Sequence, residues 1–311
     1  MLGAHLLPLG PKALQLNATA GLMGMALFFA LSGFLIVRFL AEGMPVSTFA
    51  VRRLARIVPL AWTGVACLWL WHGTNAELLA NLLFVSNLPP AHLFIGGEHL
   101  WSLCVEVQFY AAVALLCLVP SRKGLYAIPA LCVGITLLRI SDDQPVSIVT
   151  WHRVDEILAG GLVALAYCGW FGSNPKTWLG RVPIPVALCI LILCSHPAGG
   201  SLLYLRPYAG ALVVASAIFR LDKLSERLLT NPAARYIAEV SYALYVVHGI
   251  LAATWLGSGD TIHKYLKRPL LFSATFALAH LSTFYLEKPI TRLAKRFTDR
   301  KRGPPLVSGR A

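Results

Sequence analysis

Long apolar runs separated by short polar connections are the main pattern of this chain. A helix needs about 20 mostly apolar residues to cross the hydrocarbon core of a bilayer, and a spanning segment must satisfy its own backbone hydrogen bonds. The pattern therefore predicts an all-α protein, a polytopic bundle of nine transmembrane helices. The expected spans are about 21–41, 57–72, 100–119, 125–140, 154–171, 182–195, 202–219, 236–257 and 269–287.

The parts outside these spans divide simply. MLGAHLL (1–7) is apolar but too short to span, and we expect it to be the last two turns of a helix whose beginning precedes Met1. The region 73–99 is the longest loop-like connection. Residues 1–296 are expected to form one membrane domain, followed by a basic cytoplasmic tail at 297–311. No stretch is long enough to form a separate soluble domain.

Composition agrees with a membrane protein and adds an orientation. The chain is 57% hydrophobic and 13% charged, against about 25% charged in soluble domains. Its net charge of +13 would suggest a nucleic-acid partner in a soluble protein. Here alternate connections and the C-terminal tail hold 19 Lys and Arg, and the opposite set holds five. The positive-inside rule therefore predicts a multi-pass protein of the inner membrane with a cytoplasmic C-terminus, embedded in lipid and without a nucleic-acid partner.

Cysteine spacing points to no further chemistry. The seven cysteines lie in or beside apolar segments, with no CxxC pair and no Cys/His ligand set. We interpret them as small core residues, so no disulfide and no metal site is predicted.

GEHLWSLCVEVQFY (97–110) places polar groups at the start of an apolar run. His99 and Glu106 are seven residues apart, which two helical turns would bring to one face. A charged carboxylate inside a bilayer costs about 2.5 to 3.5 kcal/mol and marks a candidate functional site. The alternative is an interfacial Trp101 and His99 with one hydrogen-bonded Glu106 inside the bundle.

Arg52, Arg53 and Arg56 share one helical face at the predicted cytoplasmic end of a span. One interpretation is ordinary positive-inside anchoring. The other is a guanidinium cluster for phosphate groups, which suits the planar fork of arginine.

WHRVDEILAGG (151–161) begins a span at its outer end. Arg153 and Glu156 stand at i,i+3, so a local ion pair is slightly favoured over a substrate contact. Asp155 lies beside them, and the outward position would suit contact with an acceptor. Gly160 and Gly161 permit close approach of another helix.

Two further helices carry small or polar groups. Ser32-Gly33 lies inside an apolar helix, and we favour close helix packing over a nucleophilic serine there. Ser241, Tyr245 and His248 stand at i, i+4 and i+7, on one face of a span. Core packing and function are equally supported for this polar stripe.

Taken in order, these segments resemble the acyltransferase 3 family of integral membrane O-acyltransferases. The resemblance covers about 5–296, and six motifs in family order carry it. The segments are FFALSGFLI, FAVRRLARIVP, HLWSLCVEVQFY, WHRVDEILAGGLVA, SYALYVVHG and FYLEKP.

The resemblance implies an activity and a set of roles. The family transfers an acyl group, commonly acetyl, from a coenzyme A thioester to a hydroxyl, often of a sugar. Its first helix carries an Arg and, eleven positions later, a His. His5 matches the His, and the Arg would precede Met1. Cys104 and Val107 depart from the central motif, while Glu106 retains its first carboxylate.

The mechanism expected from the resemblance uses acyl-CoA as donor substrate, with no tightly bound cofactor and no metal. His5 would act as general base on a carbohydrate hydroxyl or form a transient acyl-imidazole. Glu106 would orient His5 or the acceptor. The CoA phosphates would bind Arg52, Arg53 and Arg56. The second-tier substrate contacts are His99, Trp101, Arg153, Asp155, Tyr245 and His248.

Two rival interpretations stay open at this point. The first is a transporter of a modified glycan or acid, although no internal repeat of the kind common in transporters is evident. The second is a truncated, inactive remnant without its first helix. Transport in the absence of acyl-CoA would favour the first, and in-frame coding sequence upstream of Met1 would argue against the second.

Overall fold

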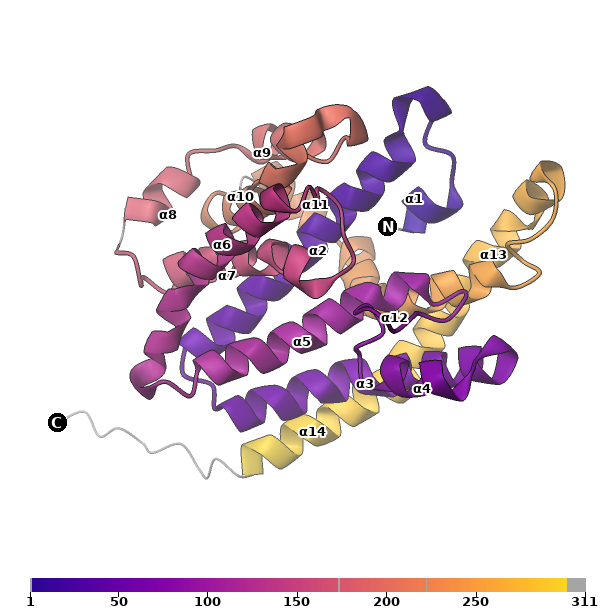
Figure 1. The fold of residues 1–311 in the computed structure, drawn as a ribbon, viewed down its shortest axis with the longest axis horizontal. Helices are drawn as coiled ribbons and strands as arrows, with labels where there is room; N and C mark the ends of the chain where they lie inside the picture. The colour runs from indigo at the N-terminus through magenta and orange to yellow at the C-terminus, as the bar shows by residue number, and fades with distance from the viewer. Residues whose placement is uncertain (1, 173, 222, 301–311) are drawn as a thin grey trace.

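The computed structural model describes residues 2–172, 174–221 and 223–300, which form a helical bundle with no strand among them (Figure 1). The all-α prediction is confirmed. The α-helices are α1 (Leu2–Leu6), α2 (Leu16–Ala41), α3 (Val46–His72), α4 (Asn75–Leu82), α5 (Trp101–Leu116), α6 (Ile128–Ser141), α7 (Asp155–Tyr167), α8 (Asn174–Leu179), α9 (Ile184–Leu193), α10 (Arg206–Phe219), α11 (Lys223–Thr230), α12 (Pro232–Ala253), α13 (Thr261–Leu281) and α14 (Lys288–Arg300).

Short helices of other kinds connect several of these. A π-helical turn, η6 (Ser282–Glu287), joins α13 to α14, so the two form one long rod. The 3-10 helices are η1 (Lys12–Leu14), η2 (Glu98–Leu100), η3 (Pro120–Ala127), η4 (Thr150–His152) and η5 (Pro197–Leu205).

Within the described ranges, seven helical segments are long and apolar enough to cross a membrane. Each overlaps a predicted span, and several extend beyond it by about ten residues. The other two predicted spans correspond to α7 and α9, with 13 and 10 residues. The segments are Lys12–Ala41, Val46–Trp71, Glu98–Leu116, Pro120–Ser141, Pro197–Phe219, Pro232–Ala253 and Thr261–Arg300.

The tightest contact of the bundle joins α2 and α7, and it depends on glycine. A Cβ on Gly33 would lie 1.8 Å from the carbonyl oxygen of Ile157, and one on Gly160 would lie 2.0 Å from that of Ala30. The two backbones therefore touch, as small residues allow in membrane helix pairs. The packing interpretation of Gly33 and Gly160 is confirmed.

The structure shows helix in two regions that were expected to be a loop and a tail. The region 73–99 contains the helix α4, which begins with a capping box. Thr74 Oγ1 accepts from the backbone N–H of Glu77, whose carboxylate accepts from the backbone N–H of Thr74. Helix α14 continues to Arg300, past the predicted start of the tail at 297, and its Thr298 and Asp299 accept hydrogen bonds from Arg52 of α3. Residues 301–311 of that tail lie outside the described residues.

Candidate functional site

A cavity of about 710 Å³ opens where α1, η2 and α12 meet, and we call it the histidine cavity. It brings together His5, His99, Trp101 and His248, four of the residues predicted from sequence. Its volume lies within the range of about 300 to 1,000 Å³ that ligand sites occupy. The cavity is lined by His5, Leu6, His92, Leu93, Gly96, Glu98, His99, Trp101, Ile148, His248, Gly249, Ala252 and Ala253.

Side-chain bonds from α2 hold the short helix α1 in place. Asn17 Nδ2 donates to the carbonyl of Ala4 at 2.7 Å and to that of Leu7 at 2.5 Å, and its Oδ1 accepts from the backbone N–H of Leu9 at 3.1 Å. These bonds satisfy backbone groups at the end of α1 that the helix cannot satisfy itself. They place His5 at the wall of the histidine cavity.

Three of the four imidazoles that line this cavity are neighbours, with their ring planes steeply inclined to one another. The ring centroid of His248 lies 5.3 Å from that of His5 and 4.8 Å from that of His99. His248 Nδ1 bonds to the carbonyl of Tyr245 at 2.7 Å, and His99 Nε2 bonds to that of Val246 at 3.0 Å. Both buried rings are thus oriented by the backbone of α12, whereas the ring of His5 is exposed.

Tyr245 ties α12 to the start of α5. Its hydroxyl donates to the carbonyl of His99 and accepts from Ser102 Oγ at 2.6 Å. Its ring stacks on Phe28 with centroids 6.0 Å apart. Tyr245 therefore fixes η2, and His99 with it, against α12.

Two sequence-based placements are corrected here. His99 belongs to the 3-10 turn η2, where the α-helical spacing of seven residues does not apply, so it does not share a face with Glu106. Ser241 is exposed and donates to the carbonyl of Ala238 at 2.8 Å, so it does not join Tyr245 and His248.

A second cavity of about 530 Å³ lies between α3, α12 and the α13–α14 rod, and we call it the arginine cavity. Its lining includes the three predicted arginines together with Lys288 and Lys295. The lining residues are Phe39, Met44, Phe49, Arg52, Arg53, Arg56, Ala238, Glu239, Thr283, Glu287, Lys288, Thr291 and Lys295.

Five cations against two carboxylates make this cavity suited to anions. Lys288 Nζ pairs with Glu239 at 2.5 Å, and Arg52 pairs with Asp299 at 2.6 Å. No such pair is present at Arg53 or Arg56, within the part of the chain the structure describes. The sequence interpretation missed Lys288 and Lys295, although their spacing of seven residues in a basic helix was a usable signal.

Glu106 lies on α5 and lines neither cavity. The carboxylate is buried and accepts from the hydroxyl of Tyr110 at 2.8 Å, with Ser32 beside it. The ring of Tyr110 meets that of Phe49, which lines the arginine cavity, with centroids 5.6 Å apart. The carboxylate therefore lies behind the arginine cavity, and no contact between it and His5 is present among the described residues.

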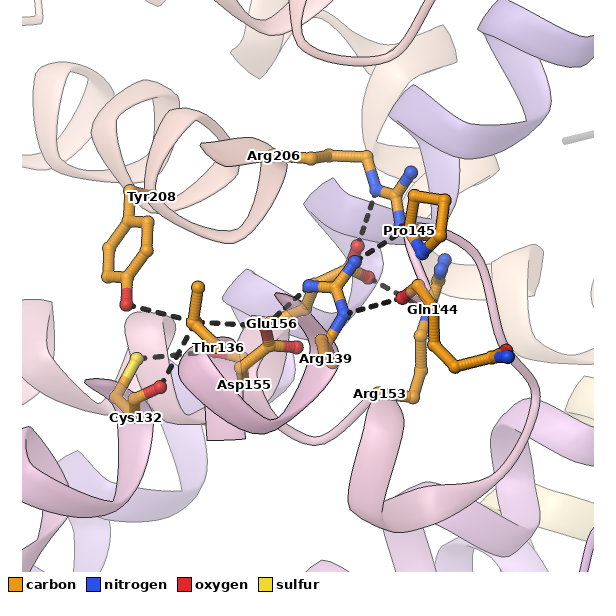
Figure 2. Close-up of polar contacts among 10 residues, drawn as sticks. All are labelled: Cys132, Thr136, Arg139, Gln144, Pro145, Arg153, Asp155, Glu156, Arg206 and Tyr208. Carbon is orange, nitrogen blue, oxygen red and sulfur yellow. Dashed lines mark hydrogen bonds and ion pairs between the residues drawn. The ribbon is translucent and has the colours of Figure 1, made fainter. Parts of the chain in front are cut away.

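A cluster of five buried charges connects α6, α10 and the start of α7 (Figure 2). Arg139 Nη1 pairs with Asp155 at 2.5 Å, and Arg206 Nε pairs with Glu156 at 2.7 Å. Arg153 Nε lies 3.4 Å from Glu156, which confirms the ion pair predicted from their i,i+3 spacing. Such pairs withstand burial only when hydrogen bonds satisfy the remaining groups, as Figure 2 shows for the Arg139 guanidinium.

Arg153 and Asp155 therefore belong to a buried network and do not line the histidine cavity. Arg153 still contacts a residue of the cavity wall. Its guanidinium lies 5.2 Å from the ring centroid of Trp101, and Trp101 lines the histidine cavity. Sequence reasoning missed Arg139 and Arg206. The available signal was an arginine inside each of two apolar spans, since such residues almost always face a partner.

A further polar group holds the loop that follows α4. Gln108 on α5 donates to the carbonyl of Phe84 at 2.7 Å and to Asn87 at 2.9 Å, and accepts from Thr150 at 2.5 Å. These bonds fasten the segments that bring His92 and Ile148 to the cavity wall.

Comparison with known proteins gives one clear family match. The family model described as an acyltransferase domain, that of the acyltransferase 3 family, matches residues 1–288. No solved structure gives a significant match.

Several curated relatives carry names of one activity. YrhL of Bacillus subtilis (strain 168), provisionally named as a peptidoglycan O-acetyltransferase, is 26% identical over 88% of this chain and 51% of its own length. The peptidoglycan O-acetyltransferase OatA of Listeria monocytogenes serovar 1/2a is 24% identical over 88% of this chain and 52% of its own length. This chain thus spans about half the length of the curated relatives it matches.

Proposed function

Because this chain belongs to the acyltransferase 3 family, we propose that it transfers a short acyl group, acetyl in the first instance, from acyl-CoA to a carbohydrate hydroxyl. The observation that carries the proposal is the pair of cavities. One is rich in arginine and lysine, the other is lined by four histidines, and separate parts of the bundle form them. An anionic donor and a neutral, hydroxyl-bearing acceptor need two such environments.

The donor binds in the arginine cavity. Arg53 and Arg56 hold the phosphates of CoA, since guanidinium groups bind phosphate through charge-assisted, bidentate hydrogen bonds. Arg52, Lys288 and Lys295 add positive charge around them. By the positive-inside rule this cavity faces the cytoplasm, where acyl-CoA is found.

The acceptor binds in the histidine cavity. Trp101 offers an apolar face to a sugar ring, and the histidines offer hydrogen-bond partners to its hydroxyls. On this orientation the cavity opens to the outer face, so the acceptor is a glycan of the cell envelope. The relatives named for peptidoglycan O-acetylation support that class of acceptor.

His5 performs the chemistry, either as general base or through a transient acyl-imidazole. As base, it takes the proton of the acceptor hydroxyl while the oxygen attacks the thioester carbonyl. A carbon–oxygen bond forms, the carbon–sulfur bond breaks, and CoA leaves as a thiolate. The pantetheine arm would pass polar groups of α5 and α12: the buried Ser102, Glu106 and Tyr110, and the half-buried Tyr245.

The decisive test uses the purified chain in lipid nanodiscs, which leave both faces accessible. Acetyl-CoA and an N-acetylglucosamine trisaccharide are supplied, and mass spectrometry detects addition of one acetyl group to the saccharide. His5→Ala should abolish the product, and Arg53→Ala should raise the KM for acetyl-CoA. Full activity of His5→Ala would remove the proposed role of His5. If the chain neither binds CoA nor forms product, the function itself is wrong.

A further inference from the structure

His5, His99 and His248 are the neighbouring imidazoles of the histidine cavity, and they can be compared by which ring nitrogen carries the proton. A neutral imidazole carries one N–H donor and one lone pair. A backbone carbonyl can only accept a hydrogen bond, so a ring nitrogen bonded to a carbonyl must be the one that carries the proton.

His99 has no proton to offer its neighbour. Its Nε2 lies 3.0 Å from the carbonyl oxygen of Val246 and therefore holds the N–H. Its Nδ1 is the lone-pair atom and faces Gly249, where an added Cβ would lie 2.2 Å away. His99 therefore cannot donate to His248, although the ring centroids are 4.8 Å apart.

His248 is constrained in the opposite sense. Its Nδ1 donates to the carbonyl of Tyr245 at 2.7 Å, which leaves Nε2 as the lone pair. That Nε2 is buried and has no hydrogen-bond partner among the described residues. A buried acceptor of this kind is unfavourable until it meets a donor.

His5 is the neighbouring ring with an uncommitted N–H. It is exposed, and its ring makes no hydrogen bond within the described part of the chain. Its centroid lies 5.3 Å from that of His248, and an N–H···N bond between two imidazoles places the centroids about 5 Å apart. The ring planes stand at 73° and no hydrogen bond joins the two rings as they lie, so a bond to Nε2 requires the exposed His5 side chain to rotate.

We propose that His248 is the positioning residue for His5, accepting the N–H of its ring through Nε2. This inference rests on the proposed function. With one nitrogen of His5 held in this way, the other must carry the lone pair, which is the form a general base needs. The sequence-based mechanism gave this orienting role to Glu106, but that carboxylate is bonded to Tyr110.

The proton balance of the step is simple. The acceptor hydroxyl gives its proton to the free nitrogen of His5 as the oxygen bonds to the acyl carbon and the CoA thiolate leaves. The resulting imidazolium keeps its other N–H on Nε2 of His248. The proton then passes from His5 to the thiolate or to water, which restores the starting state.

Two substitutions separate positioning from folding. In His248→Asn, the amide nitrogen takes the place of Nδ1 and keeps the bond to Tyr245, but nothing remains at Nε2. In His248→Gln, the longer side chain brings an amide oxygen close to the Nε2 position, where it accepts the N–H of His5. His263→Asn, at an exposed histidine outside both cavities, is the matched control.

We expect His248→Asn to lower kcat about 100-fold, within the usual range for general-base catalysis, with the KM for acetyl-CoA changed less than about twofold. His248→Gln should recover at least about tenfold over the Asn variant. His263→Asn should have the same kcat as the wild-type protein. A wild-type kcat in His248→Asn would overturn the proposal. Equal losses of kcat in His248→Asn and His248→Gln, with thermal stability unchanged in both, would overturn it as well.

A readout without turnover tests the positioning directly. Nuclear magnetic resonance of the nanodisc-embedded chain with ¹⁵N-labelled histidine reports which nitrogen of His5 is protonated. One tautomer should dominate in the starting protein, and His248→Asn should yield a mixture. An unchanged His5 signal would reject the inference. If this coupling is present but acetyl transfer is absent, the proposed function fails and the positioning stands.

Discussion

Gly33 on α2 and Ile157 on α7 are so close that a Cβ on the glycine would lie 1.8 Å from the carbonyl oxygen of the isoleucine. Backbone cannot move aside as a flexible side chain can. This contact aligns α2, which carries Phe28 and Phe29 toward the histidine cavity, with α7, which carries the buried carboxylates. A methyl group at this position should therefore force the two helices apart.

Gly33→Ala is expected to destabilise the protein by about 1 to 3 kcal/mol, the usual range for overpacking. Guanidinium unfolding in detergent micelles measures the change. Gly134→Ala is the matched control, because a Cβ on that helical glycine would meet nothing within 4 Å. The two variants behaving alike would show that α2 and α7 do not make this contact.

Arg139→Leu should cost about 3 to 5 kcal/mol of stability, because it leaves the Asp155 carboxylate buried without its cation. Adding Asp155→Leu should recover most of the loss, since a matched apolar pair is often neutral. The same unfolding assay reports both. Asp142→Asn, in an exposed pair with His152, should change stability by no more than about 1 kcal/mol. A double variant Arg139→Leu/Asp155→Leu that is less stable to unfolding than Arg139→Leu alone would contradict this account.

Arg53→Ala should weaken CoA binding about 10- to 100-fold, because one charge-assisted hydrogen bond contributes about 1.5 to 3 kcal/mol. Isothermal titration of the nanodisc-embedded chain with CoA measures it. Arg38→Ala is the control, since that arginine pairs with Glu42 and does not line the arginine cavity. Equal CoA affinity in Arg53→Ala and Arg38→Ala would show that CoA does not bind in the arginine cavity.

Asp299→Asn should act in the opposite direction and tighten CoA binding up to about threefold. Its carboxylate lies 2.6 Å from Arg52 Nη2 and competes with a phosphate for that guanidinium. The effect is small because the pair is partly exposed. Weaker binding in this variant would mean that Asp299 holds Arg52 in a productive position.

Gly249→Ala should reduce acetyl transfer while leaving CoA binding unchanged. An added Cβ would lie 2.2 Å from His99 Nδ1 and Cε1, so the ring must move and break its bond to Val246. Transfer to the trisaccharide and CoA titration measure the two effects. Wild-type acetyl transfer by Gly249→Ala would show that the reaction does not need His99 in this position. A loss of CoA affinity would indicate a wider change of the fold.

The site could be predicted only in part, and the residues show why. Arg52, Arg53 and Arg56 were found because a helical face is a local property, and the arginine cavity contains all three. The i,i+3 pair of Arg153 and Glu156 was found for the same reason. Two predictions from helical spacing were wrong. His99 does not share a face with Glu106, because it lies in a 3-10 turn, and Ser241 does not join the polar stripe, because it is exposed.

The sequence by itself determined the class of protein, the positions of the long spans and the residues worth testing. Hydropathy and helical period depend on neighbours along the chain, so they can be evaluated without a fold. Only the tertiary structure decided which of these residues meet. His5, His99 and His248 come from distant segments, and Asp155 and Glu156 found their cations on α6 and α10. Such contacts depend on how closely helices approach, as the backbone contact of α2 with α7 at Gly33 and Gly160 illustrates.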